Sequence, residues 1–139
     1  MHLRPASALT TEGARAVLAA AVARAADSST PVSVAVVDAG GHLLVLERMD
    51  GAAAHTVHSA TTKAATAASM RKPTGATGAG VDLAYGLGIA LAAGGRWTPL
   101  PGGVPLLVDG ECVGALGVAG APPEVDELVS AAGAAALRA

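Results

Sequence analysis

Two histidines and a lysine on one predicted helix are the residues of this chain best suited to chemistry. His55 and His58 are three residues apart, so a helix places them on one face, which Thr62 continues. Two neighbouring imidazoles could ligate a divalent metal or a haem iron, or exchange protons near neutral pH. The alternative is that both histidines lie on a solvated helix face without a role.

Charged residues near this helix could complete such a site. Asp50, just upstream, could supply a carboxylate beside the histidine pair. Lys63 could bind a ligand carboxylate or, once desolvated, act as a base, although its position in an alanine seam is more typical of a lysine that extends to solvent. Arg48 and Arg71 could bind an anionic group through their guanidinium groups, and for Arg71 we favour a solvated charge.

Two glycine-punctuated segments, 31–50 and 100–120, hold most of the strand-forming sequence and must position these side chains. Each contains two apolar runs joined by turn residues, Asp38 to Gly41 in the first and Asp109-Gly110 in the second. Both segments are predicted to be β-hairpins. Pro105 suits an edge strand or a bulge, because proline has no N–H for a central ladder position.

Apolar residues spaced by three and four predict helices around these hairpins. The first follows Thr10, a plausible N-cap, and ends before Pro31. The second covers about 53–70, and its slim alanine seam is suited to tight packing. The last begins at Pro122-Pro123-Glu124, with a buried face of Val125, Leu128, Val129, Ala132 and Ala136. A glycine-rich loop over 75–80 and a short helix over 81–93 are expected in between.

The order of elements argues for an α+β fold with an antiparallel sheet covered by helices, without a βαβ train. At 139 residues we expect one domain, 1–139. The net charge of −2 gives no basic surface for nucleic acid, and apolar stretches are too short to span a membrane. No apolar leader is visible, so a cytoplasmic location is expected.

The core is short of large side chains, since the chain has no Phe, one Trp and one Tyr. Small residues bury less apolar surface, and a bound ligand or contacts between subunits could make up the difference. We therefore predict a homo-oligomer. Cys112 has no partner for an internal disulfide and is expected to be a small buried core residue.

Several motifs occur in one order along the chain: VAVVDAGGHLLVLERMDGA in the first hairpin, KAATAA from Lys63, KPT from Lys72, and GGVP and GALGVAGA in the second hairpin. Together they resemble the GlcG/HbpS-type haem-binding family, which includes the C-terminal domain of PduO-type proteins. The resemblance covers roughly 10–137. It implies a profilin-like sandwich with a central antiparallel sheet of about five strands, assembling into dimers or larger rings.

The resemblance also suggests roles for particular residues. Lys63 occupies the lysine of the family's K-A motif, and Thr74 resembles a threonine connected with haem contact, although it could equally be a cap. Gly102 and Gly103 match the family's G-G-V-P loop together with Pro105, where glycine permits close approach of a ligand or subunit, or simply a tight bend. His55 and His58 are departures, because the family usually has small or acidic residues there.

Three hypotheses remain open at this point. The first is a protein that binds haem or a related tetrapyrrole, a small-molecule ligand, between the second helix and the glycine loop. The second is a small-molecule enzyme, an isomerase, cyclase or hydrolase, that uses His55 and His58 as an acid–base pair or as metal ligands. The third is an assembly module without a ligand. Whether the chain is an enzyme is undecided by its sequence.

Overall fold

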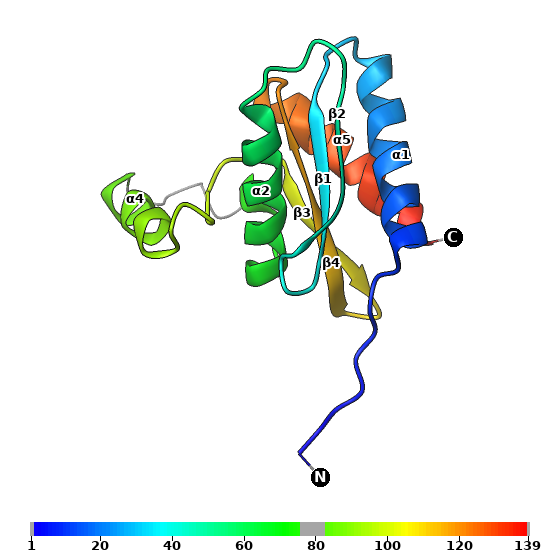
Figure 1. Ribbon diagram of the computed structural model, residues 1–139, viewed down its shortest axis with the longest axis vertical. Coiled ribbons are helices and arrows are strands. Elements are labelled where there is room, and N and C mark those ends of the chain that lie inside the picture. The colour runs from blue at the N-terminus through cyan, green and yellow to red at the C-terminus, as the bar shows by residue number, and fades with distance from the viewer. Residues whose placement is uncertain (1, 76–82, 139) are drawn as a thin grey trace.

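The computed structural model describes residues 2–75 and 83–138, and Figure 1 labels its helices and strands. In chain order these are α1 (Thr11–Asp27), β1 (Ser33–Asp38), β2 (Leu43–Arg48), α2 (Thr56–Met70), α4 (Leu83–Ala92), β3 (Gly103–Val108), β4 (Glu111–Ala119), α5 (Pro123–Ala135) and the short 3₁₀ helix η1 (Ala136–Arg138). Within these residues, no helix is both long enough and apolar enough to cross a membrane.

The two predicted hairpins pair with each other in one antiparallel sheet. The strand order is β2-β1-β4-β3, so β1 and β4 are central and β2 and β3 are the edges. The predicted α+β class is confirmed, but the expectation of about five strands is wrong for the described residues, which form four. The segment before β3 adds no strand, because Pro99 and Pro101 lack an N–H and Gly102 has a φ of 119°.

Pro105, which has no N–H to donate, lies on an edge strand of the sheet. It belongs to the edge strand β3, and the register with β4 shifts one residue later, between Leu106 and Leu107. An edge position beside a bulge is the setting predicted for this proline.

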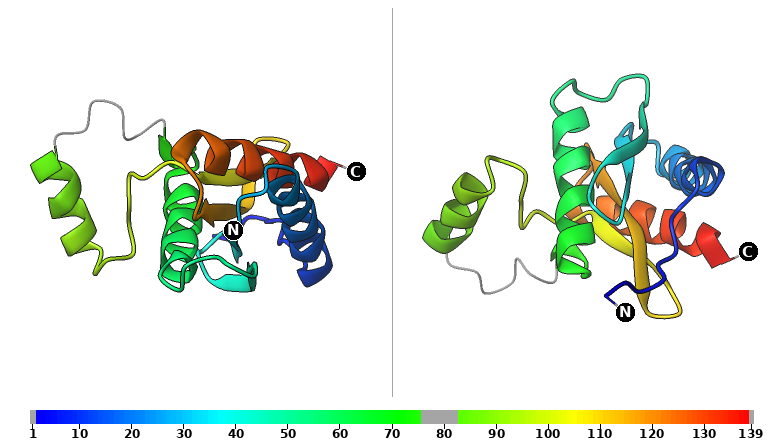
Figure 2. Two further views of the ribbon diagram at one scale, coloured as in Figure 1. Left: turned by 90° about the horizontal axis from the view of Figure 1, so that it is seen from above. Right: turned by 60° about the horizontal axis from the view of Figure 1, so that its bottom comes forward.

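Helices cover both faces of the sheet (Figure 1). α1 and α5 pack together on one face, while α2 lies along the other, as the two views of Figure 2 also show. Alternate residues of β1 pack into the two core layers, one on each face of the sheet. Val34 and Val36 pack with α1 and α5, and Ala35 and Val37 pack with α2. The first layer consists mainly of valine and leucine side chains, whereas the second is almost entirely alanine.

The alanine layer brings α2 unusually close to the sheet. A Cβ atom added at Gly117 of β4 would overlap the carbonyl oxygen of Ala60 and lie 2.6 Å from the backbone nitrogen of Ala64. Only glycine fits at this crossing. The tight packing predicted from the alanine seam is confirmed.

The outer helices follow the predicted boundaries more closely than the predicted faces. Thr10 caps α1, since its hydroxyl oxygen accepts a 3.0 Å hydrogen bond from the Gly13 N–H. In α5, however, Leu128 is 54% exposed, and Asp126, Ser130 and Gly133 are buried with Val129. The helix is thus rotated from its most apolar face, because a charged partner inside the protein draws Asp126 inward, as described below.

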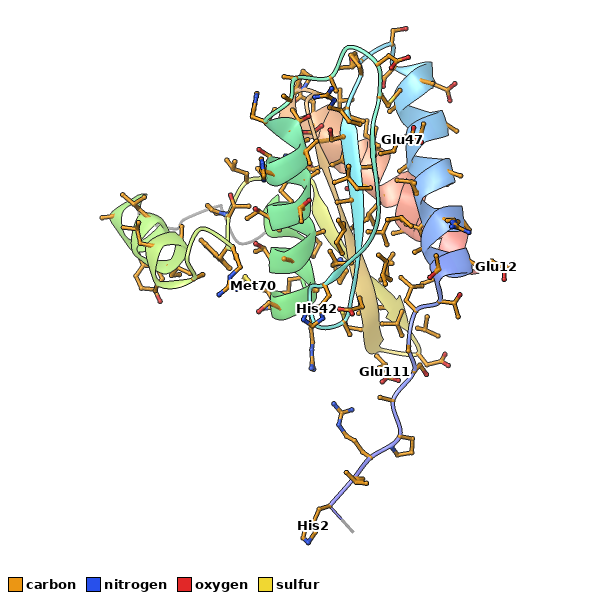
Figure 3. The ribbon with its side chains drawn as sticks, in the orientation of Figure 1. His2, Glu12, His42, Glu47, Met70 and Glu111 are labelled. Carbon is orange, nitrogen blue, oxygen red and sulfur yellow. The ribbon has the colours of Figure 1, made fainter. Side chains whose placement is uncertain are left out.

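α4 confirms the short helix expected after α2, although the predicted residues 81 and 82 and most of the glycine-rich loop lie outside the described residues. Both views of Figure 2 show it standing apart from the body. The chain returns from α4 along α2, where Trp97 Nε1 lies 3.2 Å from the sulfur of Met70, a residue that Figure 3 labels at the α4 side of α2. Cys112, expected in the core, is only half-buried.

A carboxylate fixes the β1–β2 turn. Asp38 Oδ1 accepts hydrogen bonds of 2.9 Å from the N–H groups of both Gly40 and His42, and Oδ2 lies 3.2 Å from Nδ1 of His42, which Figure 3 labels at this turn. The hydrogen bond from the His42 N–H is the main cause that lowers the pKa of Asp38 from its usual value of 3.8.

Because of Asp38 in this turn, the stability of the fold should depend on pH in the acidic range below the usual aspartate pKa of 3.8. A carboxyl with a lowered pKa in the folded protein stabilises the fold above its unfolded pKa, and that contribution is lost as the pH falls through the folded pKa. We therefore expect Asp38→Asn to weaken the loss of stability on acidification, measured as the urea midpoint between about pH 2 and pH 7. Asp50→Asn, at an exposed carboxylate, is the control. Equal effects of the two substitutions would contradict this expectation.

Candidate functional site

A hollow of about 350 Å³ opens where three segments meet: the start of α2, the loop before β3, and the link from β4 to α5. Two larger hollows, of about 750 and 650 Å³, lie beside β3 and beside the N-terminal segment. The hollow of about 350 Å³ is lined by both charged side chains that are buried in the described part of the chain. Its lining consists of Ala53, His55, Thr56, Ser59, Lys63, Leu100, Pro101, Ala119, Gly120, Ala121, Pro123 and Asp126.

The two buried charges form an ion pair between α2 and α5. Lys63 Nζ lies 3.2 Å from Asp126 Oδ2, and the two side chains are 7% and 4% exposed. Lys63 also donates a 2.8 Å hydrogen bond to the carbonyl oxygen of Val118, and Asp126 Oδ1 accepts one of 3.1 Å from the Ala121 N–H. The pair therefore joins α2, α5 and the end of β4 at one point.

This arrangement corrects the expectation that Lys63 extends to solvent. A Cβ atom added at Gly117 would lie 3.0 Å from Cβ of Lys63, so the base of the lysine side chain lies directly against the sheet. Because α2 approaches β4 so closely, the four-carbon stem is buried and its ammonium group reaches the end of β4. Spacing alone cannot distinguish this path from a path to solvent.

Burial dominates the electrostatics of Asp126. It raises the pKa of the Asp126 carboxyl above its usual value of 3.8, while the charge of Lys63 and the Ala121 N–H act in the opposite direction. The carboxyl therefore takes up a proton more readily than an exposed aspartate does.

The glycine loop packs against this pair. Gly102 has a φ of 119°, and a Cβ atom there would lie 2.5 Å from the Val118 carbonyl oxygen and 3.1 Å from Lys63 Nζ. A Cβ atom at Gly103 would overlap the backbone carbonyl of Lys63 and lie 2.8 Å from Cγ2 of Thr74. The close approach that these glycines permit is to the protein's own backbone and to Lys63.

Thr74 fixes the loop from the other side. Its hydroxyl donates a 2.6 Å hydrogen bond to the Leu100 carbonyl and accepts one of 3.0 Å from the Gly103 N–H, and the residue is 1% exposed. These two hydrogen bonds join Thr74 to the loop before β3, and the haem contact that the resemblance suggested stays a prediction.

Only one member of the histidine pair lies at the hollow. His55 is the N-cap residue of α2 and has helical dihedral angles, with φ −67° and ψ −18°; its side chain is exposed, makes no capping hydrogen bond, and stands at the rim of the hollow. His58 is exposed and Thr62 half-buried, and neither lines the hollow. His55 keeps the helical spacing to His58 because its carbonyl oxygen accepts a 3.2 Å hydrogen bond from the Ser59 N–H, but only His55 lines the hollow.

Other predicted site residues lie elsewhere. Arg48 and Asp50 are exposed near the end of β2, Pro105 is on the edge strand, and Arg71 is an exposed residue beside the N-terminal segment. Within residues 2–75 and 83–138, no group of three or more His, Cys, Asp or Glu side chains could hold a metal ion. A divalent metal bound by one copy of the chain thus finds no ready set of ligands there.

Comparison with known proteins gives this site its context. A family model for haem-degrading, HbpS-like proteins matches residues 9–135. The chain belongs to this HbpS-like family. The resemblance drawn from the ordered motifs is thereby confirmed.

Relatives of this HbpS-like chain include the protein GlcG of Escherichia coli K12, which is 40% identical over 111 residues, 79% of this chain and 80% of GlcG. Among solved structures, the Klebsiella pneumoniae protein ORFY superposes with a TM-score of 0.93 at 27% identity, covering 100% of this chain and 97% of ORFY. The crystal structure of a PduOC:haem complex superposes with a TM-score of 0.87 at 32% identity, covering 95% and 96%.

Asp126 is the residue of the HbpS-like chain that sequence reasoning missed. A signal was present: Asp126, Val129, Ser130 and Gly133 recur at a helical spacing of three, four and seven. That stripe is polar and small, so hydropathy favoured the neighbouring stripe through Leu128. A polar stripe on a terminal helix is informative only when a buried cation elsewhere is known.

Proposed function

We propose that this protein binds haem or a related tetrapyrrole at the hollow beside Lys63. The observation that supports the proposal most is the match to the PduOC:haem complex, which extends over 95% of the chain at 32% identity. Membership of an HbpS-like family points in the same direction. Fold alone would not suffice, because different sites occur on similar folds.

The residues at the hollow fit such a ligand. His55 offers an exposed imidazole at the rim, Leu100 and Pro101 offer apolar surface, and Lys63 offers a cation. A volume of about 350 Å³ is at the lower end of the range for ligand pockets. One edge of a porphyrin would therefore enter the hollow, and the rest of the macrocycle would lie over its mouth.

His55 is the residue we assign to the iron. A neutral imidazole is a common axial ligand of haem, and an exposed side chain without a capping hydrogen bond can turn toward an incoming ligand. When bound, haem would supply an iron centre that can exchange small ligands. The contribution of the chain is to hold the iron through His55 and to bury one edge of the macrocycle.

Titration with haemin, followed by absorbance in the Soret region, tests this assignment. We expect a saturable shift for the natural protein and at least about tenfold weaker binding for His55→Ala, since one iron ligand is lost. His58→Ala and His42→Ala are matched controls, because both remove exposed histidines that do not line the hollow. A flat titration of the natural protein would reject haem binding. Equal haemin affinities of the natural protein and His55→Ala would reject His55 as the iron ligand.

Within the described residues, no specific contact favours the enzyme hypothesis, since His58 and Asp50 do not line the hollow with His55. Assembly into a dimer or a larger ring stays a prediction. It is compatible with large apolar side chains that are exposed on α4, where Leu87 is 58% and Leu91 is 72% exposed.

A further inference from the structure

The Lys63 ammonium group is held by an internal carboxylate at the wall of a hollow that is open to solvent. An ammonium group has three protons to donate. Two acceptors are described for Lys63, the Val118 carbonyl oxygen and Asp126 Oδ2. Lys63 and Asp126 also line the hollow. A small ligand inside it would therefore meet a cation that is already paired with a carboxylate of the protein.

We propose that the hollow binds a carboxylate group on Lys63, and that this carboxylate replaces Asp126 as the charged partner of the lysine. The ligand class is a small molecule or a ligand edge that carries a carboxylate. The inference rests on the proposed function in placing a ligand in the same hollow, where a haem propionate would be one such group.

The hollow supports a carboxylate in other ways. α2 and α5 both begin at its wall, through Thr56 and Pro123, and the N-terminal ends of helices favour negative charge. His55 at the rim could add a further donor. The walls near the lysine are small, being formed by Ala119, Gly120 and Ala121, so a compact carboxylate can approach it.

Charge balance requires one proton. A ligand carboxylate beside Lys63 and an ionised Asp126 would place two negative charges on one buried cation, which is unfavourable. Protonation of Asp126 from solvent restores neutrality, and its Oδ1 can keep the hydrogen bond from the Ala121 N–H. No covalent bond changes: one carboxylate enters and one proton is taken up.

The surroundings of Asp126 suit this exchange. Lys63 on α2 and His55 at the rim are the titratable groups that line the hollow with it, and its own helix adds the exposed Glu124 and Glu127. The segments 100–102 and 118–121 that pack nearby contain no titratable side chain. Since burial raises the pKa of Asp126, the proton is taken up readily, and affinity should increase as the pH falls toward that pKa.

Acetate is the probe that tests this exchange without haem. In ¹⁵N-labelled protein we expect acetate to shift the amide signals of Gly120 and Ala121 saturably, while acetamide, its neutral counterpart, does not. Lys63→Met should weaken acetate binding at least about tenfold, because the charge-assisted hydrogen bond is lost. Asp126→Asn should strengthen it about tenfold and remove the part of its pH dependence that Asp126 causes, because no competing carboxylate remains.

The Asp126→Asn variant decides between exchange and a purely structural pair. If it weakens acetate binding as Lys63→Met does, or if acetate shifts signals away from the hollow, the proposal is overturned. Should Lys63→Met fail to fold, the comparison of acetate with acetamide in the natural protein and in Asp126→Asn remains decisive. Haemin binding without acetate binding would reject this inference alone, and the reverse result would reject only the proposed function.

Discussion

Replacing Asp126 by leucine is expected to lower the free energy of unfolding by about 3–5 kcal/mol, because removal of one partner leaves a buried charge without compensation. Lys63 would then keep the Val118 carbonyl oxygen but lose the carboxylate 3.2 Å away, while its side chain remains 7% exposed. Urea denaturation at pH 7 measures the loss as a shift of the midpoint at constant slope.

Two comparisons isolate the cause. Glu124→Leu removes an exposed acid from the first turn of the same helix and should cost no more than about 1 kcal/mol. The double variant Lys63→Met with Asp126→Leu should recover most of the loss, since apolar pairs of similar volume often replace buried ion pairs at little cost. A loss of less than about 1 kcal/mol in Asp126→Leu would show that the pair is not desolvated.

Gly117→Ala is expected to destabilise the protein by about 3 kcal/mol or more, the upper end of the effects of overpacking. The added methyl group would meet the Ala60 carbonyl oxygen and the Ala64 nitrogen. Both are backbone atoms of α2, so no side chain can rotate away, and the helix must move off the sheet. Denaturation midpoints measure the loss, and amide spectra would locate the displacement along α2.

Gly88→Ala is the matched control for this substitution. Gly88 lies inside α4, and a Cβ atom there would meet nothing within 4 Å. The change should therefore be neutral or stabilise α4 by up to about 1 kcal/mol, because alanine favours helix over glycine. If Gly117→Ala costs no more than Gly88→Ala, the close approach of α2 to β4 does not limit the core.

Local sequence determined much of the fold. The turn residues after Val37 and Val108 predicted both hairpins, and Thr10 predicted the start of α1, because these signals depend on a few adjacent residues. The strand count came from resemblance, not from such a signal. Two prolines before β3 locally oppose an additional strand.

The candidate site was less accessible to sequence reasoning, because its partners are far apart along the chain. Lys63 and Asp126 are 63 residues apart, and their meeting depends on how α2 crosses β4 at Gly117. The histidine pair gave the stronger local pattern, yet only His55 lines the hollow. A spacing rule relates residues of one helix, and it does not predict which of them meets a site formed by distant segments.

The alanine layer beneath α2 also restricts the course of evolution. A larger residue at Ala60, Ala64 or Ala67 would clash with the sheet, and glycine there would weaken the helix. Substitution by either a larger or a smaller residue would therefore lower stability. Lineages can accumulate substitutions on the outer surface of α2 far more easily. The exposed His58 lies on that surface, so inheritance can vary this histidine while the buried architecture that carries it stays the same.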